Sequence, residues 1–474
     1  MLPDDVLLEI FDFYVNGAEP EGEEKTVFEE KVMIESWQTL VHVCRRWRTV
    51  VFGSPRRLDL QLVCTSNTRA GDTLDVWPPL PLSIRAEFND SYKIENIIPV
   101  LQCSDRVHKI ILENIFSSEL EDVLKAMQEP FPGLTDLVIT VWLSGETDDT
   151  EPVLPLPDSF LGGSTPRLQS LRLSNIPFVA LPKLLLSATH LAYLYLEKIP
   201  HSGYIPPKAM VTALSTLTNL QMFHLTFQSP LSRPDRASRL LPPPTRSDLP
   251  FLTTLKFKGV GDYLDDLVTY IDAHQLDRLD ITLFNQIFFE TPEFIQFIRR
   301  TPAFKALDRS HVVFGSFAAE IILSLRTSPY PVVSVEIPCK ELDWQISSLE
   351  QVCTSCLPPL SALEDLYVSQ KTHSKPDWKD NVEDSLWLEL LHPFPTVGNF
   401  FLSEEFAPRI APALEELVGA RTTEVLPTLQ NIFVEGLGPS GPVQEGIRKF
   451  VAARQVTSLP LSVSPWDGSW PRWA

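Results

Sequence analysis

Two short motifs in the sequence contain residues that could do chemistry, and the first is a cysteine pair. Cys353 and Cys356 form a C-x-x-C motif, with Cys339 before it and His373 after it. Thiolates and imidazoles can hold Zn²⁺, but a structural zinc site usually has a second close pair of ligands, which is missing here. The alternative is that both cysteines are small buried thiols on the helix that precedes Leu363. We therefore predict no metal site.

The second motif is a glycine-rich loop. Gly436, Gly438 and Gly441 have the spacing G-x-G-x-x-G and follow an apparent strand, Ile432 to Glu435. Such a loop can hold a pyrophosphate at the start of a helix. However, Pro439 removes an amide from the loop, and too little chain follows to complete the strand-helix-strand unit of a dinucleotide site. We interpret the motif as a strand-to-helix turn.

Other catalytic signatures are absent from the sequence. It contains no H-E-x-x-H, G-x-S-x-G or G-K-[ST] motif, and none of its nine histidines lies in a recognisable catalytic pattern. We predict that the chain is not an enzyme and that it uses no cofactor. An enzyme interpretation would need a cavity at residues 436–441 that is able to hold a nucleotide.

Composition limits the possible partners and location. The 474 residues have a formal net charge of -21 and a pI near 4.9, which argues against nucleic acid as a partner. The start of the chain lacks the layout of a signal peptide, and no apolar run approaches the ~20 residues of a membrane span. The six cysteines are scattered, so reduced thiols are expected. We expect an intracellular protein, cytoplasmic or nuclear, without a membrane partner.

The elements that would position a binding site are repeats. In Pro166 to Ile176, the apolar residues Leu168, Leu171 and Leu173 predict a short strand with one buried face. About eleven copies of this spacing, roughly 23 to 34 residues apart with one gap, predict a leucine-rich-repeat solenoid. The other copies are Val107/Ile110/Leu112, Leu134/Leu137/Ile139, Leu191/Leu194/Leu196, Leu220/Phe223/Leu225, Leu252/Leu255/Phe257, Leu276/Leu279/Ile281, Val332/Val335/Ile337, Leu363/Leu366/Val368, Val397/Phe400/Leu402 and Leu429/Ile432/Val434.

Helical or irregular returns are expected between these strands. Strands that alternate with such returns predict a parallel sheet on the inside of a curved array. A degenerate copy is expected near His311 to Phe314. The returns are Glu119 to Gln128, Leu181 to Ser187, Pro207 to Leu217, Tyr263 to Ala273, Pro292 to Arg300, Phe317 to Arg326, Leu342 to Cys356 and Val382 to Leu391.

The repeats lack one residue of the commonest leucine-rich pattern. Its ninth position holds an asparagine whose side chain satisfies backbone groups at the turn, and here that position is apolar. We therefore expect turns closed by apolar packing and backbone bonds, and a less regular curve. The residues at this position are Ile115, Ile176, Ile199, Val260 and Leu437.

Two helices are predicted before the repeats. Leu2 to Tyr14 opens with Pro3 and two acids and has an apolar stripe, and a second helix is predicted from Ser36 to Phe52. Helices this short bury too little surface to be stable alone, so we expect some apolar surface to remain for a partner. The alternative is that they only cap the open edge of the solenoid.

These helices resemble a known family. L-P-D-D-V-L-L-E-I-F, followed by L-V-H-V-C-R-R-W, is similar to the F-box, the helical module that attaches substrate receptors to the Skp-type adaptor of cullin-RING ubiquitin ligases. The extension W-R-x-V-V-F-x-S-P-R-R-L-D-L resembles large fungal-type (basidiomycete-like) F-box proteins. The chain departs from the pattern by an acidic insert at residues 16–35. The resemblance implies an adaptor surface formed by Leu2, Pro3, Val6, Leu7, Ile10, Phe11, Leu40, Val43, Cys44 and Trp47.

The target surface is expected on the inner face of the solenoid. If Leu171 and Leu173 are buried, the alternation of strand side chains places Arg172 on the opposite face. Aromatic and cationic residues on that face often anchor protein interfaces. The stretch from Lys256 to Arg278 would be a basic patch. The target-binding candidates are Tyr193, Tyr195, His224, Lys256, Lys258, Arg278, Tyr367, Phe401 and Phe433.

The predicted fold class is α/β, with a short helical F-box followed by an irregular leucine-rich-repeat solenoid that has parallel strands on its concave side and helices or loops on its convex side. The expected parts are the F-box at residues 1–57, transition strands and a linker at 58–104, the solenoid at 105–438, and a C-terminal helix with a capping tail at 439–474. The resemblance implies a non-catalytic substrate receptor that binds the adaptor, the cullin ligase core and an unknown target protein. The alternative is a repeat scaffold with no ubiquitin role.

Overall fold

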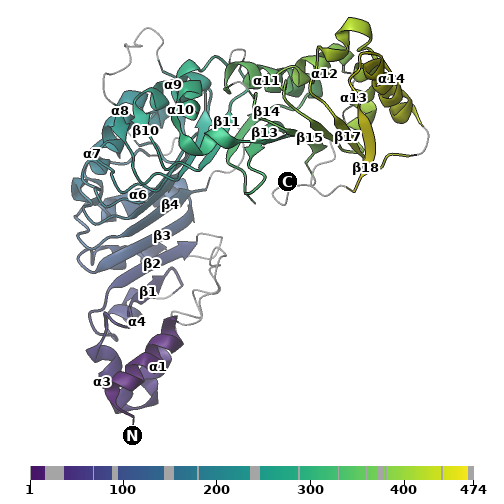
Figure 1. Cartoon of the computed structure of the whole chain (residues 1–474). Helices are drawn as coiled ribbons and strands as arrows, with labels where there is room; N and C mark the ends of the chain where they lie inside the picture. The colour runs from purple at the N-terminus through teal and green to yellow at the C-terminus, as the bar shows by residue number, and fades with distance from the viewer. Residues whose placement is uncertain are drawn as a thin grey trace. The chain divides into compact units, whose positions relative to one another are not determined.

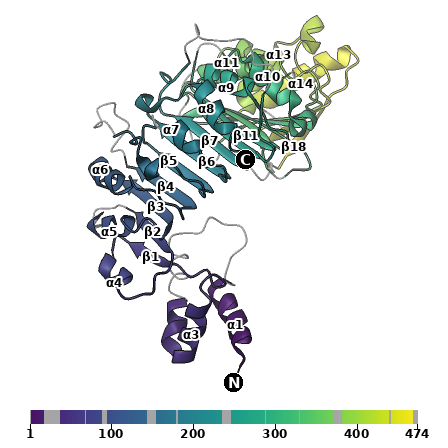
Figure 2. The same ribbon diagram turned by 90° about the vertical axis from the view of Figure 1, so that its left-hand side faces the viewer.

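A computed structural model of the chain describes residues 2–16, 37–67, 69–87, 94–142, 154–178, 181–234, 246–286, 289–328, 330–358, 360–371, 378, 382–438 and 441–467 (Figure 1, Figure 2). The chain divides into two compact units, Met1–Leu191 and Ala192–Ala474. In each unit, helices lie on one face of a mostly parallel sheet. No helix in the described ranges is both long enough and apolar enough to cross a membrane.

Short helices open the first unit. They are α1 (Asp4–Asn16), residues 37–43 and α3 (Arg45–Gly53). The prediction of one continuous helix from Ser36 to Phe52 is wrong at Cys44, which has an extended backbone with φ -159° and ψ 168°. The Cys44 Sγ accepts the backbone N–H of Trp47 and thereby caps α3, while the Arg48 side chain donates to the Val41 carbonyl at the end of the preceding helix. Both broken ends therefore gain a side-chain partner.

The first unit continues as a parallel sheet whose strands follow one another in chain order. Its strands are β1 (Leu62–Thr65), β2 (Leu82–Glu87), β3 (Val107–Ile115), β4 (Asp136–Val141) and β5 (Ser170–Ser174). The returns contain α4 (Ala70–Leu74), η1 (Ile94–Asn96), α5 (Ile98–Leu101), α6 (Ser117–Ala126), η2 (Phe160–Gly163) and α7 (Leu181–Leu185).

The second unit holds the larger part of the repeat array. Its sheet has the spatial order β6 (Tyr193–Ile199), β7 (Met222–Phe227), β9 (Thr254–Gly259), β11 (Arg278–Leu283), β14 (Val333–Pro338), β13 (Ala318–Ser324), β12 (Arg309–Phe314), β15 (Asp365–Gln370), β16 (Asn399–Leu402), β17 (Asn431–Glu435) and β18 (Ser462–Trp466). A separate pair joins β8 (Ser247–Asp248) to β10 (Ile271–Asp272). The helices are α8 (Pro207–Leu214), α9 (Gly261–Thr269), α10 (Pro292–Arg300), α11 (Leu342–Ser355), α12 (Asp384–Leu391), α13 (Ala407–Glu415) and α14 (Pro442–Val456), with η3 (His201–Gly203), η5 (Pro302–Ala306) and η6 (Gly419–Thr423).

An antiparallel insertion interrupts the second unit. β12 is the expected degenerate copy, but Phe317 to Arg326, predicted as a return, contains the strand β13. β13 pairs antiparallel with both β12 and β14, whereas β14 pairs parallel with β11 and β12 pairs parallel with β15. After β11, the chain therefore forms β12 three positions further along the sheet. β13 and β14 then occupy the two positions between β12 and β11 in reverse order.

The alternation of the predicted strands is confirmed in the core. Leu171 and Leu173 are fully buried, and their register partners on β4 are Leu137 and Ile139, which are also fully buried. Rows of this kind run across neighbouring strands on the face that the helices cover. Each fully buried Leu or Ile contributes roughly 1.5–3 kcal/mol relative to an exposed one, so the rows hold the repeats together.

The turn after several strands explains the missing asparagine. The residue before the apolar ninth position has a left-handed backbone at Asn114, Asn175, Lys198 and Gly436, with φ between 50° and 63°. The side-chain amide of Asn175 donates to the Val141 carbonyl at 2.7 Å. An asparagine is thus present in two of these turns, but one position earlier than in the common pattern. At that earlier position the backbone is left-handed, a conformation that asparagine tolerates better than most residues. The apolar residue that follows is fully buried at Ile115, Ile176 and Ile199, as expected, whereas Leu437 is only half-buried.

Candidate functional site

The cysteine pair is part of the core. Cys353 lies in α11 and Cys356 follows it, both are buried, and the Cys356 thiol donates to the Phe289 carbonyl. Burial raises the pKa of both thiols, to about 12 for Cys356, so both remain protonated. Cys339 is half-buried, and His373 lies outside the described residues. Within the described ranges, no three His, Cys, Asp or Glu side chains gather closely enough to hold a metal ion.

The glycine loop lies beside a cavity of about 250 Å³ between the end of β17 and the start of α14. The carboxylates of Glu404 and Glu435 line it, and the Glu404 Cδ lies 3.2 Å from where a Cβ on Gly436 would be. Two carboxylates at this position would repel a phosphate. The cavity is also smaller than the roughly 300–1,000 Å³ of typical ligand pockets, so it suits a side chain better than a nucleotide.

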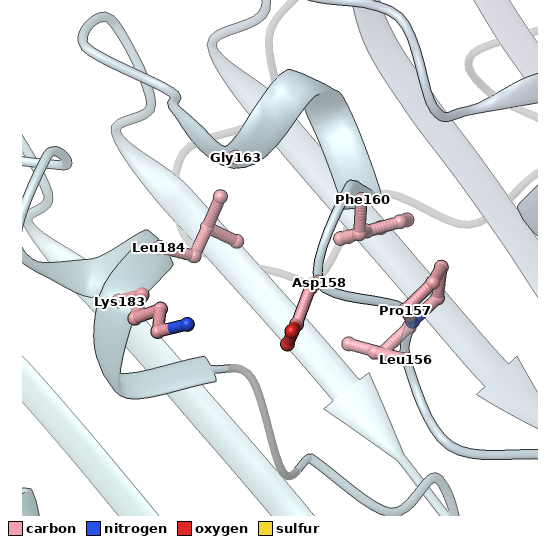
Figure 3. Close-up of a pocket in the computed structure, with 7 residues that line it drawn as sticks. All are labelled: Leu156, Pro157, Asp158, Phe160, Gly163, Lys183 and Leu184. Carbon is pink, nitrogen blue, oxygen red and sulfur yellow. The ribbon is translucent and has the colours of Figure 1, made fainter.

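Two further cavities lie in the first unit. One, of about 80 Å³, is lined by the apolar side chains of Leu156, Phe160 and Leu184 and by the charged side chains of Asp158 and Lys183 (Figure 3). Its volume equals only a few water molecules at ~30 Å³ each. The other, of about 480 Å³, lies along α5 and α6 and is lined by Ile94, Glu95, Ile98, Pro99, Gln102, Asp122, Lys125 and Ala126. The described residues that line these three cavities include no histidine, cysteine or serine.

The candidate adaptor residues divide into a buried and an exposed set. Leu7, Phe11 and Leu40 are buried, and Trp47 is half-buried, with its ring 4.8 Å from the Phe11 ring. Arg46 forms an ion pair with Asp4 at 2.6 Å and also donates to the Leu2 carbonyl, which joins α3 to the start of α1. The exposed set is Leu2, Pro3, Val6, Ile10, Val43 and Cys44.

The exposed set belongs to a larger apolar surface on α1. Val6, Ile10, Phe13 and Tyr14 have helical spacing and are 38%, 47%, 77% and 51% exposed. We call these four residues the exposed α1 stripe. The sequence comparison with the F-box pattern missed Phe13, although a second apolar stripe beside Leu7 and Phe11 was visible in the helical periodicity. Apolar side chains gathered on one helix face commonly mark a protein interaction site.

The candidate target residues all lie in the second unit, on the sheet face opposite the helices, which we call the strand face. Their exposure differs. Tyr193, Lys256 and Arg278 are exposed, whereas Tyr367, which we expected to be exposed, is only 7% exposed because its ring is stacked against that of Phe401. The half-buried members are Tyr195, His224, Lys258, Phe401 and Phe433.

Register places most of these residues in one row across the sheet. Tyr195 of β6 is the register partner of His224, which in turn pairs with Lys256. At the other end of the sheet, Tyr367, Phe401 and Phe433 are successive register partners. Their ring centroids are 4.2 and 4.6 Å apart, and their planes differ by 9° and 10°. We call these three stacked rings the aromatic ladder.

Two neighbours support the aromatic ladder. Two residues before it along the strands, the Asn399 amide donates to Asp365 and the Asn431 amide donates to Asn399, both at 2.8 Å. On the other side, Trp466 of β18 packs 5.6 Å from the Phe401 ring at an interplanar angle of 65°. This tryptophan had been assigned only to a tail from the sequence. Its role depends on a register that the spacing of apolar residues does not reveal.

Acidic groups reduce the charge of the expected basic patch. Arg278 forms an ion pair with Asp280 on its own strand at 3.1 Å, and Asp280 is the register partner of Lys256. Nearby, Glu320 and Glu336 are direct partners on β13 and β14. Burial, together with the charge of Glu336, raises the pKa of Glu320, although its hydrogen bond from Ser334 opposes this shift. This part of the strand face is therefore mixed in charge.

No protein-family model matches the chain, and no curated protein matches it. A solved structure that resembles it is the leucine-rich repeat-containing protein LegL7 from Legionella pneumophila. That structure is 12% identical, with a TM-score of 0.27, and the match covers 82% of this chain and 96% of that one.

Proposed function

We propose that this protein is a non-catalytic substrate receptor of an SCF-type (Skp-cullin-F-box) ubiquitin ligase. The observation that carries the proposal is the exposed α1 stripe, four apolar residues at helical spacing within a segment that resembles the F-box. The strand face of the second unit would hold the target protein. The ligase's conjugating enzyme would then modify lysines of the bound target, and the gain in rate would come from proximity alone.

The two sets of N-terminal residues would contribute differently. Val6, Ile10 and Phe13 can lose solvent contact only when a partner covers them, so they would supply the apolar area of the interface. Leu7 and Phe11 are already buried, and they would act by holding α1 against α3. A charged residue at Leu7 would therefore unfold the helices and would not distinguish docking from folding.

The test uses purified Skp-type adaptor and the variant Ile10→Asp. A charge in the centre of the exposed α1 stripe should weaken adaptor binding at least tenfold, measured by isothermal titration calorimetry. The control is Phe317→Asp, which changes a residue that is 70% exposed in the second unit and should leave adaptor binding unchanged. Circular dichroism should show that both variants keep their helices. An adaptor that binds Ile10→Asp as tightly as the unmodified chain would contradict the proposal.

A repeat scaffold without a ubiquitin role is the second candidate. The aromatic ladder favours it as much as it favours the receptor, because a target surface alone needs no adaptor. In that case the adaptor would fail to co-elute with the unmodified chain during size-exclusion chromatography, while proteins captured through the strand face would still co-purify. The same experiment on the chain with and without its first 57 residues separates the two functions.

A further inference from the structure

We propose that Lys256 and Lys258 on the strand face bind two carboxylates of an extended acidic segment of the target, in which the acidic residues occupy alternate positions. The inference rests on the proposed function, because it names the kind of target that the strand face would hold. It concerns only the second unit and is independent of the adaptor.

The two lysines lie on the same face of β9, within the sheet. They alternate with Leu255 and Phe257, which are fully buried on the helix-covered side, so both lysines belong to the strand face. Their Cα atoms are about 6.6 Å apart, because they are separated by two residue steps of an extended strand. β9 pairs with β7 on one side and with β11 on the other. Lys256 is exposed and Lys258 is half-buried.

The carboxylate beside the lysines is already paired with another cation. Asp280 is the register partner of Lys256 on β11, but its carboxylate accepts the Arg278 Nε at 3.1 Å. Among the described residues, no carboxylate forms an ion pair with Lys256 or Lys258. The Lys258 ammonium lies over the Phe284 ring, 5.9 Å from its centroid. Two positive charges on neighbouring positions of one strand are therefore left for a partner.

A hydroxyl next to Lys258 can contribute to the same site. Thr282 of β11 is the register partner of Lys258, and its half-buried side chain donates no hydrogen bond to any other residue that the structure describes. A hydroxyl is a donor as well as an acceptor, so it suits a carboxylate. A carboxylate above Lys258 can therefore accept from the ammonium and from the Thr282 hydroxyl together, and hydrogen bonds to a charged group are the stronger kind.

The local charge favours an acidic occupant, although the whole chain has a formal charge of -21. At physiological salt, charges in water are screened over about 8 Å. Glu336 lies on β14, two strands from β9, so its backbone is about 9.6 Å from that of Lys258. Glu320 lies one strand further away. A segment that follows β9 is therefore closer to the two lysines than to these carboxylates.

The spacing of the lysines favours an extended segment. In an extended chain, side chains at alternate positions point to the same side and are also about 6.6 Å apart. A segment that runs along β9 would thus place one carboxylate over each lysine. Acidic residues that are adjacent in the segment would point to opposite sides, and only one of them would reach the strand face.

Fluorescence anisotropy on the full chain tests the inference. The probe is a fluorescein-labelled nine-residue peptide of alternating serine and glutamate. The matched peptide has the same composition, but its four glutamates form two adjacent pairs separated by two serines, and a third peptide has glutamine in place of glutamate. We expect the alternating peptide to bind at least threefold more tightly than the paired peptide, and the glutamine peptide not to bind.

Three outcomes of this experiment would overturn the inference. Equal affinity for the two acidic peptides would exclude the extended arrangement. Binding of the glutamine peptide as tight as that of the alternating peptide would exclude recognition by charge. Displacement of the alternating peptide by inorganic phosphate at equal concentration would show that the lysines hold a free anion and not a segment of a protein.

Variants locate the binding position. Lys256→Gln combined with Lys258→Gln removes both charges and should lower affinity for the alternating peptide at least tenfold. Lys208→Gln combined with Lys305→Gln removes the same number of charges from exposed positions on α8 and η5, and should leave the affinity within twofold. If the two double variants have the same affinity, the peptide responds to overall charge and the inference is wrong.

The result is separable from that for the proposed function. Peptide binding needs no adaptor, so a failed adaptor titration leaves this test intact. Conversely, an alternating peptide that binds the Lys256→Gln and Lys258→Gln double variant normally would overturn only the assignment of the acidic segment, while the receptor function would stand.

Discussion

At the scale of single residues, His311 shows how a side chain on the strand face can be fully buried. Its Nε2 lies 2.6 Å from the Ser369 Oγ on β15, and its ring is 6.0 Å from that of Tyr367, the first ring of the aromatic ladder. Burial lowers the pKa of His311 from 6.5 to about 3, because the charged imidazolium would lose its hydration. The folded protein therefore keeps this histidine neutral at pH values well above 3.

A pH-dependent stability follows. The unfolded chain binds a proton at His311 near pH 6.5, whereas the folded chain does not until about pH 3, so stability is complete above pH 6.5 and falls as the pH is lowered through this range. The loss should approach about 1.4 kcal/mol per pH unit. We expect His311→Gln to lose less stability than the unmodified chain between pH 7 and pH 5, by about 2 kcal/mol in urea unfolding. Identical pH profiles would contradict the assignment of this histidine.

Residue types in the turns were only partly readable from the sequence. The apolar ninth position was predicted correctly, but the left-handed residue before it was not recognised. Asn114, Asn175 and Gly436 are residue types that tolerate this backbone, so a signal was present. Lys198 adopts it as well, and this residue type gives no such signal.

At the scale of elements, the apolar spacing predicted strands reliably because each strand buries one side in the same helix-covered core. It failed where the local pattern was ambiguous. Phe317 to Arg326 contains a mostly apolar run, A-A-E-I-I-L, interrupted only by Glu320. This run fits a buried helix turn as well as a strand, and only pairing with β12 and β14 decides between them. The break at Cys44 had no glycine or proline to mark it.

β18 illustrates how an element can end a sheet. It is the last strand of the sheet in the described part of the chain, and the Ser462 N–H donates to the Gln430 carbonyl on the β17 side. Because backbone groups alternate along a strand, those of Val463 and Pro465 point away from β17. Pro465 has no N–H to offer there, and such prolines are found on sheet edges.

We expect Pro465→Thr to increase self-association. The substitution restores an outward N–H on an edge to which none of the described strands pairs, which lets a second chain add a strand. Sedimentation velocity at several concentrations should show dimers or larger species that the unmodified chain lacks. Pro460→Thr, which lies outside β18, is the matched control and should remain unchanged. A monomeric Pro465→Thr would show that another feature protects this edge.

At the scale of the whole molecule, the two candidate surfaces belong to different units of the chain. The exposed α1 stripe lies in the first unit, and the aromatic ladder and Glu435 lie in the second. The stripe could be predicted in part from helical periodicity and the resemblance. The ladder could not, because three rings from strands about thirty residues apart stack only when the register is known.

We therefore expect the two binding events to be independent. Ile10→Asp should leave the capture of proteins through the strand face unchanged, and Phe433→Leu should leave affinity for the adaptor unchanged. In the double variant, each loss should equal that of the single variant within about 0.5 kcal/mol, as expected for sites without shared contacts. Adaptor titration, together with the amount of a captured strand-face partner that co-purifies, measured on all four proteins, tests this directly. A larger coupling would mean that one ligand alters the site of the other.

The strands β12, β13 and β14, whose order in the sheet is the reverse of their order in the chain, also constrain the order in which the second unit can fold. A regular repeat protein can form one repeat after another, each on the surface of the last. Here β15 and the strands after it can pair with one another, but they have no link toward β11 until β12 is in place, and β12 is connected to β11 only through β13 and β14. Growth from either end must therefore stop at this point, and the two halves of the unit become one cooperative structure only when the three strands close the gap together.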